Sequence, residues 1–308
     1  MHIPQPSPAR LLRALLPLLA LPLLLSACGD DDDGIQWAPG GGDDEPEVSQ
    51  SEARVADRME CPRLKGDANE RLLSYWTREG GDSVMTYCLA YDLEKLHARW
   101  VAFRFDAQTR KTGSNRNDAW QDDTRLPQKY RIGTGTFGSG YDRGHICASY
   151  DRQYSVAANQ NTFYMTNMSP MIGDFNGGYW STLEQLVQNL GRDKAFASTL
   201  YVVKGGTLSE LTGYVSRTGG KRVAVPRYYF TALLSRHNGV YHSIAFLMEH
   251  KDYGYSHESR APRSVLKQHV LTVNALEKRT GIDLFPNLPD DREESIEDEC
   301  EPSVWRIY

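Results

Sequence analysis

Short apolar runs separated by turns dominate the chain after about residue 60. Residues 100–105 alternate Val101, Phe103 and Phe105 with other side chains, which is typical of a half-buried strand. Similar runs predict strands at residues 86–91, 162–165, 199–203, 223–225, 228–234 and 242–248. Helical spacing occurs at residues 179–190 and 264–279, and residues 61–78 are mixed, with room for a short helix. Because strands outnumber helices without regular alternation, we predict an α+β domain with a largely antiparallel sheet.

The first residues carry a different pattern. Arginines at positions 10 and 13 stand at the start of a leucine-rich run, residues 11–25, which two prolines interrupt, so the run is too short and broken for a membrane span. It ends at Leu25-Ser26-Ala27-Cys28, which is similar to a bacterial lipobox. We therefore expect residues 1–27 to be a lipoprotein signal peptide that is removed, with lipidation of Cys28. The alternative is an ordinary signal peptide with Cys28 free or paired.

Acidic and glycine residues then follow, from Asp30 to Glu47, with too few apolar groups to offset the entropy of ordering. We expect residues 28–57 to be an acidic flexible tether and residues 58–308 to be one domain. Whether the acidic run is a charged spacer or resembles an export signal of surface lipoproteins stays open.

Net charge changes once the tether is set apart. The whole chain carries 35 basic and 40 acidic side chains, a formal charge of -5. Without the two leader arginines and the eight acidic residues between positions 29 and 50, the rest of the chain is close to neutral. Global charge therefore neither supports nor excludes a polyanionic substrate, for which a local basic lining is sufficient. Candidates for that lining are Arg125, Lys129, Arg131, Arg217, Lys221, Arg222 and Arg227.

Besides Cys28, the chain has four cysteines, an even number that allows two disulfides in an exported protein. We favour Cys61 with Cys300 and Cys88 with Cys147, and free buried thiols are the alternative. No CxxC spacing occurs, which argues against a structural zinc site.

Residues 141–147, Tyr-Asp-Arg-Gly-His-Ile-Cys, carry the most informative chemistry. His145 follows a glycine-rich turn, and downstream stand Asn167, Asn176 nine residues later and Glu184 eight residues after that. An imidazole accepts a proton near neutral pH, while amide and carboxylate oxygens suit a hard divalent cation. Such a set can hydrolyse a phosphodiester.

This series resembles the DNA/RNA non-specific endonucleases, the ββα-metal (His-Me finger) family that includes endonuclease G. The resemblance runs from Asp-Arg-Gly-His through a strand at residues 161–166, the turn at 167–170, the helix start at 176–180 and the pair Leu183-Glu184. Weaker similarity continues to about residue 291. It implies a central, mainly antiparallel sheet flanked by helices. The GxGxxG pattern at residues 133–138 lacks a following helix, so a dinucleotide site is not expected.

The resemblance assigns a role to each site residue. His145 is the general base that activates water, and Asn176 is the direct ligand of Mg²⁺ or Mn²⁺ through its amide oxygen. Glu184 holds metal-bound waters, and Asn167 lies beside the histidine and helps to hold the site. Arg143 either contacts phosphate or braces the loop by pairing with Asp142 or another acid.

Two features of the helical segment qualify this picture. Asn176 and Glu184 would lie about 80° apart around a helix and about 12 Å along it, so one ion reaches both only through water or if Asn176 precedes the regular helix. Several relatives also have an arginine one turn after the glutamate, where this chain has Gln188. Arg192 could substitute only from a different angle.

We expect an exported, Mg²⁺-dependent endonuclease that hydrolyses DNA and RNA with little sequence specificity, because phosphate contacts carry no base information. Its predicted location is the bacterial cell envelope, lipid-anchored to the outer membrane on the periplasmic or surface face, and a homodimer is a further expectation. One alternative is a catalytically silent surface lipoprotein that binds nucleic acid or a protein partner on the same scaffold. A phosphodiesterase for another substrate is a third.

Overall fold

The computed structural model describes residues 54–308 apart from residues 139, 217–219 and 221, all within the unit Gly41–Tyr308. The predicted signal peptide, Cys28 and most of the predicted tether lie outside the described residues. Val55 is buried against the core, so the folded part already includes residues before the predicted domain start at 58. Within the described part, no helix is both long and apolar enough to cross a bilayer.

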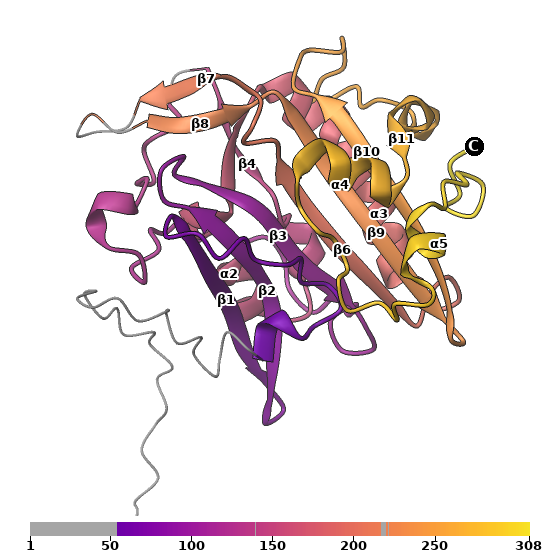
Figure 1. Cartoon of the computed structure of the whole chain (residues 1–308). Coiled ribbons are helices and arrows are strands. Elements are labelled where there is room, and N and C mark those ends of the chain that lie inside the picture. Colours follow the sequence, from indigo (N-terminus) through magenta and orange to yellow (C-terminus); the bar gives the residue numbers. More distant parts are fainter. Residues whose placement is uncertain (1–53, 139, 217–219, 221) are drawn as a thin grey trace, which may run out of the picture. The chain divides into compact units, whose positions relative to one another are not determined.

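A twisted antiparallel sheet forms the centre of the described part, with strand order β1-β2-β3-β6-β9-β10-β11 (Figure 1). Its strands are β1 Glu70–Glu79, β2 Asp82–Asp92, β3 His97–Phe105, β6 Thr199–Gly206, β9 Tyr228–His237, β10 Val240–Glu249 and β11 Val270–Leu271. Two hairpins lie outside this sheet: β4 Asp142–His145 with β5 Met168–Met171, and β7 Leu211–Ser216 with β8 Arg222–Pro226. The α+β class and the mainly antiparallel sheet are therefore confirmed.

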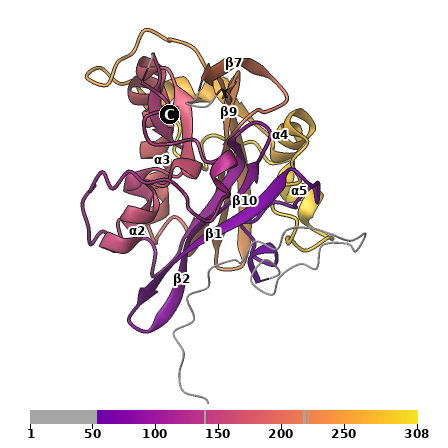
Figure 2. The same cartoon turned by 90° about the vertical axis from the view of Figure 1, so that its left-hand side faces the viewer.

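Helices cover both faces of the sheet, as the edge-on view shows (Figure 2). Helix α3 packs on one face, and α4 and α5 pack on the other. The helical elements are η1 Gln128–Tyr130, η2 Ser149–Arg152, α2 Val156–Asn161, η3 Met165–Asn167, η4 Phe175–Trp180, α3 Ser181–Arg192, η5 Arg263–His269, α4 Val273–Thr280 and α5 Glu293–Glu297. The alternation along β3 explains the two layers, because Val101, Phe103 and Phe105 join the α3 core while Trp100 and Ala102 join the α4 core.

Three local predictions were wrong. Residues 61–78 contain no helix in this structure but most of strand β1. Its neighbours Leu72 and Leu73 are both buried, one in each core, so its apolar side chains do not alternate regularly. Residues 162–165, predicted as a strand, form a turn that leads into η3, and the second strand of the site hairpin is β5. The predicted helix 264–279 is divided into η5, β11 and α4.

The predicted disulfide pairs are not brought together. Cys147 is buried without another cysteine beside it among the described residues, and Cys300 is exposed. The thiols of Cys61 and Cys88 instead lie 3.0 Å apart.

Helix α3 is positioned by a close approach of the η4 turn to a neighbouring loop. A Cβ atom added at Gly178 would overlap the backbone of Tyr255, and the Ala261 amide donates to the Gly178 carbonyl at 2.9 Å. Only glycine therefore allows this contact, and η4 in turn sets where α3 begins.

We predict that Gly178→Ala lowers the free energy of unfolding by about 1–3 kcal/mol, because the added methyl must displace backbone. The matched control is Gly213→Ala, where an added Cβ meets no atom within 4 Å. Urea unfolding followed by circular dichroism measures both. Equal stability of the two variants would show that the approach at Gly178 does not constrain α3.

Candidate active site

The β4–β5 hairpin presents the histidine. His145 is the last residue of β4 and pairs with Met168 of β5, while Gly144 pairs with Ser169. A Cβ atom at Gly144 would overlap the side chain of Met171, so a glycine allows that side chain to pack over β4. The Gly-His pair of the motif is thus explained by packing as well as by chemistry.

Asn167 holds the chain directly after the histidine. Its Oδ1 accepts from the Cys147 amide at 2.9 Å, and its Nδ2 donates to the carbonyls of Cys147 at 2.9 Å and Thr162 at 2.8 Å. The side chain is fully buried, so each bond is made away from water. The side chain of Asn167 therefore positions the His145 loop, and its burial keeps it from contacting a substrate directly.

The imidazole of His145 is packed among aromatic rings. Its ring centre lies 5.3 Å from that of Trp120 and 5.0 Å from that of Phe163, which meets it edge-on. The side chain is 8% exposed, and its Nε2 has no hydrogen-bond partner among the described residues. A buried ring nitrogen without a partner is unusual and fits an atom that acts on a ligand.

Burial is the main cause that lowers the pKa of His145 to about 3, and the positive charges of Arg116, Arg143 and Lys204 contribute to this shift. A hydrogen bond to the backbone of Arg143 acts in the opposite direction. The imidazole is therefore neutral at physiological pH, the form that can accept a proton.

Asn176 lies in η4, a π-helical turn that directly precedes α3. Its Nδ2 donates to Asp142 Oδ2 at 3.1 Å, which ties it to the start of β4 and leaves its Oδ1 as the atom available to a cation. Because Asn176 precedes the regular helix, the condition set by the sequence for sharing one ion with Glu184 is met. Single π turns occur frequently at functional sites.

A cleft of about 610 Å³ brings several of these groups together. Its lining residues are Arg116, Trp120, Thr134, Gly135, Phe137, Gly138, Tyr141, Asp142, Arg143 and Asn176. His145 is not among these lining residues, but its imidazole packs against Trp120, whose ring does line the cleft. The predicted base and the predicted metal ligand thus belong to one region.

Arg143 extends along the wall of the cleft. Its guanidinium lies 3.9 Å from the ring centre of Trp120, and Nη1 donates to the Thr134 carbonyl at 3.4 Å. Asp142 accepts from Asn176 and does not brace Arg143. Of the two roles considered from the sequence, this placement favours contact with phosphate.

Glu184 lies in the first turn of α3 and is half-buried. Its pKa is raised to about 7, mainly by desolvation; the charge of Asp151 acts in the same direction and that of Lys204 in the opposite one. Asn176 and Glu184 make no direct contact in the described structure, so a shared ion would need water molecules between it and the carboxylate.

Sequence reasoning missed four residues here: Arg116, Trp120, Asp151 and Lys204. Arg116 has its guanidinium 5.1 Å from the Phe163 ring centre and 5.7 Å from that of Trp120, at the cleft. An arginine four residues before a tryptophan was the available signal, but nothing in the sequence links that pair to His145.

Of the basic residues proposed as a phosphate lining, Arg217 and Lys221 lie outside the described residues, and the other five do not line the cleft. Arg125 is paired with Asp123 at 2.6 Å, and Arg227 with Glu249 at 3.6 Å. Arg131 donates to two backbone carbonyls, and Arg222 lies over the Tyr214 ring. Lys129 lies over the ring of Tyr130. Arg116 and Arg143 are the cations at the cleft.

The donor atoms fit a weakly chelated hard cation. Among the described residues, no group of three or more His, Cys, Asp or Glu side chains could hold a metal. The Asn176 amide oxygen and the Asp142 carboxylate nevertheless face one cleft, and oxygen ligands suit Mg²⁺, which usually retains several waters.

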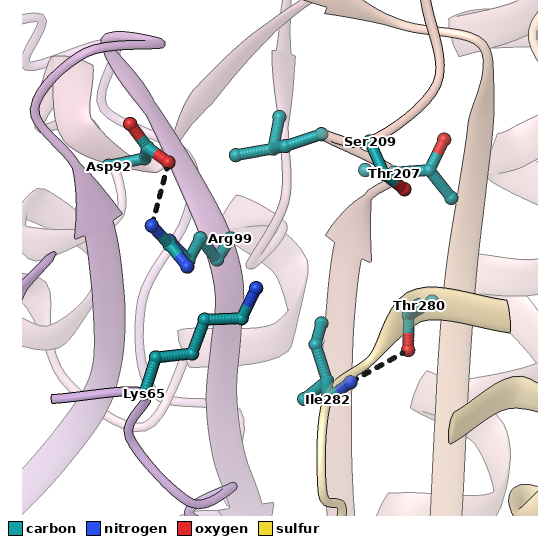
Figure 3. Close-up of a pocket in the computed structure, with 9 residues that line it drawn as sticks. Lys65, Asp92, Arg99, Thr207, Ser209, Thr280 and Ile282 are labelled. Carbon is teal, nitrogen blue, oxygen red and sulfur yellow. Dashed lines mark hydrogen bonds and ion pairs between the residues drawn. The ribbon is translucent and has the colours of Figure 1, made fainter. Parts of the chain in front are cut away.

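A second pocket, of about 180 Å³, lies between β2, β3 and the chain after β6 (Figure 3). Arg99 points at Asp92, with 3.0 Å between Nη2 and Oδ2, and also pairs with Asp67 at 2.9 Å. Because carboxylates already neutralise its guanidinium, this pocket is a poor phosphate site compared with the cleft.

A two-stranded hairpin that presents a histidine, followed by a helix that begins beside an asparagine, defines a ββα-metal nuclease fold. The sequence matches the model of the DNA/RNA non-specific endonuclease family over residues 71–291, and the chain belongs to this family. The family implies a divalent metal ion and nucleic-acid substrates.

Three proteins with similar sequences are named as nucleases. The chain is 27% identical over 236 residues to mitochondrial nuclease EXOG of Xenopus laevis, covering 72% of this chain and 62% of that protein. It is 26% identical to human mitochondrial endonuclease G, covering 66% and 68%. It is 36% identical over 121 residues to a nuclease of Nostoc, covering 39% and 43%.

A solved structure shows the same fold. A chain from the crystal structure of the EndoG/EndoGI complex superposes with a TM-score of 0.54 at 22% identity, covering 70% of this chain and 88% of that one. This chain spans less than two thirds of the Xenopus protein it matches.

The depressed pKa of His145 predicts acid sensitivity. Because its folded pKa of about 3 lies below the unfolded value near 6.5, the unfolded chain binds the proton first, and stability is lost as pH falls from about 6.5 towards 3. In EDTA, the wild type should lose more unfolding free energy between about pH 7 and 5 than His145→Gln does. Exposed His257→Gln is the control and should follow the wild type. Parallel pH profiles for wild type and His145→Gln would contradict the assignment.

Proposed function

We propose that this protein is a Mg²⁺- or Mn²⁺-dependent endonuclease that hydrolyses phosphodiester bonds of DNA and RNA with little sequence preference. One observation carries the proposal: the buried Nε2 of His145 has no partner among the described residues, and Trp120, which packs on its imidazole, lines a cleft together with two arginines and Asn176. Family membership and the named relatives support the same reaction class.

His145 acts as the general base. In-line attack on phosphorus needs a water that loses a proton, and the free Nε2 is the acceptor. A base with a pKa near 3 is weak, but two of the charges that depress it belong to Arg116 and Arg143. When these arginines pair with substrate phosphates, their effect on the imidazole is offset, so the basicity of His145 rises when substrate is bound.

Asn176 and Glu184 hold the cation, Asn176 directly and Glu184 through water. The Asp142 carboxylate orients the Asn176 amide by accepting from its nitrogen. The chemistry that the bound cation supplies is neutralisation of charge on the phosphate and on the departing 3′ oxygen. Arg143 contacts a phosphate, while Asn167 keeps the His145 loop in place.

Weak sequence preference follows from the character of the cleft. Arg116 and Arg143 recognise phosphate, which is the same at every step of DNA and RNA. Their guanidinium groups rest on the rings of Trp120 and Phe163, and this stacking directs the positive charge into the cleft. Such a contact does not depend on which base lies nearby.

We also propose that the nuclease is exported and anchored to the cell envelope by lipid on Cys28. The support is the sequence alone: the lipobox-like Leu25-Ser26-Ala27-Cys28 and the acidic segment after it. Metabolic labelling with a fatty-acid analogue, with Cys28→Ala as the control, tests it, and equal labelling of both proteins would refute it.

We predict that the purified domain cleaves a plasmid and a structured RNA with Mg²⁺ and not with EDTA. His145→Ala should lower kcat by about 10²- to 10⁴-fold while nucleic-acid binding persists, because only the base is lost. Asn176→Ala should raise the Mg²⁺ concentration needed for half-maximal rate. Gel assays of cleavage and a fluorescence binding assay measure these effects.

His242→Ala is the matched control, because this histidine lies on β10, pairs with Glu299 and does not line the cleft. Normal turnover by His145→Ala would contradict the assigned base. Binding without cleavage by the wild type would instead favour a silent nucleic-acid-binding lipoprotein.

A further inference from the structure

A fully buried ion pair joins η2, just after the His145 loop, to strand β6. Lys204 of β6 places Nζ 2.7 Å from Asp151 Oδ2, and neither side chain is exposed to solvent. Lys204 points toward α3 and the hairpin, because Leu200 and Val202 of the same strand parity belong to the α3 core. A pair without solvent access costs desolvation and therefore calls for an explanation.

Asp151 connects three elements of the site. Its Oδ2 accepts from the amide of Ala148, the residue after Cys147 in the His145 loop, at 2.9 Å. Its Oδ1 accepts from Gln188 Nε2 at 3.1 Å, one turn after Glu184 on α3. With Lys204 from the sheet, the carboxylate joins the base loop, the helix of the predicted metal site and the central strand.

Lys204 is also a buried cation that acts electrostatically on both the predicted base and the predicted metal-site carboxylate. Its charge acts on Glu184 and on His145. Arg192, the candidate substitute on α3, is occupied elsewhere, because its Nη2 donates to the Tyr150 carbonyl and to Gln153 Oε1 at 3.1 Å. Gln188 itself carries no charge and donates a hydrogen bond from its side-chain amide to Asp151.

We propose that Lys204 is a positioning residue: through Asp151 it holds Glu184 of α3 against the loop of His145 and supplies the positive charge that Gln188 does not. This inference rests on the proposed nuclease function. Lys204 contacts no substrate, so its effect passes through Asp151 and the carboxylate of Glu184.

Lys204→Met retains the volume and removes the charge. We expect kcat on plasmid DNA to fall about 10- to 100-fold and the Mg²⁺ requirement to rise, with KM for DNA unchanged, as is typical when a group supporting a metal ligand is lost. Rates are divided by the folded fraction from thermal melts. A purely structural role would change the melt but not kcat or the Mg²⁺ dependence.

Moving the cation tests the assignment further. In Lys204→Met/Gln188→Arg, the guanidinium reaches Asp151 from the helix, and most of the lost kcat should return. Gln188→Arg alone is the control. If Lys204→Met does not fold, Asp151→Asn/Lys204→Met removes both charges and leaves none unpaired, and should show the same kinetic defect.

Normal kcat and Mg²⁺ dependence in a folded Lys204→Met, or no recovery in the arginine variant, would overturn the proposal. An inactive wild type would instead overturn the proposed nuclease function, so the two failures are distinguishable.

A separate observation concerns two thiols on the opposite side of the sheet. Cys61, before β1, and Cys88, in β2, place their Sγ atoms 3.0 Å apart, and both are buried in the core shared with α4. No comparable partner lies beside Cys147 or Cys300 among the described residues. We propose that Cys61 and Cys88 form a disulfide in an oxidising compartment.

The reaction removes two protons and two electrons from the two thiols, and a disulfide oxidant accepts them and is reduced to a dithiol. The new bond would close the chain around β1 and tie the segment after the tether to the sheet. Because Cys88 faces the α4 core and the cleft lies on the α3 side, activity should not depend on it.

The test is thiol counting on residues 54–308 secreted into an oxidising compartment. Alkylation in denaturant should find Cys147 and Cys300 free, and mass spectrometry without reductant should find the Cys61–Cys88 peptide pair. Cys61→Ser/Cys88→Ser should melt at lower temperature with the kcat of the wild type. Four free thiols, or a pair that includes Cys147 or Cys300, would refute the proposal.

Discussion

The site depends on one buried amide. Asn167 satisfies both polar groups of the Cys147 backbone and a carbonyl of the preceding turn, so the loop after His145 keeps its shape without regular secondary structure. A buried donor or acceptor left without a partner costs about 1–3 kcal/mol, which explains why a side chain with both kinds of group stands at this position. The histidine is aimed by this loop on one side and by the hairpin pairing on the other.

Electrostatics then decides what the histidine can do. Aromatic packing from Trp120 and Phe163 buries the imidazole and is the main cause of its lowered pKa, to which the arginines that rest on the same rings add. Under the proposed function, substrate recognition and proton transfer are coupled, because the charges proposed to bind phosphate also act on the proposed base.

Much of the fold and part of the site could be predicted from sequence. Alternating side chains identified β3, and the ordered series His145, Asn167, Asn176 and Glu184 identified the family, since those spacings reflect one local hairpin-and-helix unit. β1 was missed because Leu72 and Leu73 are buried in opposite cores, so its apolar residues do not simply alternate. Asp151 and Lys204 were missed because their pairing joins residues 53 positions apart, and Arg116 because only the folded rings of Trp120 and Phe163 bring it to the cleft.

The π turn at Phe175–Trp180 has a consequence for how this chain can change its length. Such a turn contains one residue more than an ordinary helical turn, and each residue rotates a helix by about 100°. A deletion of a single codon there would allow a uniform helix but would swing the Glu184 carboxylate a quarter-turn away from Asn176. Insertions and deletions in natural variants should therefore gather in the outer hairpins, while the six-residue junction before α3 keeps its length.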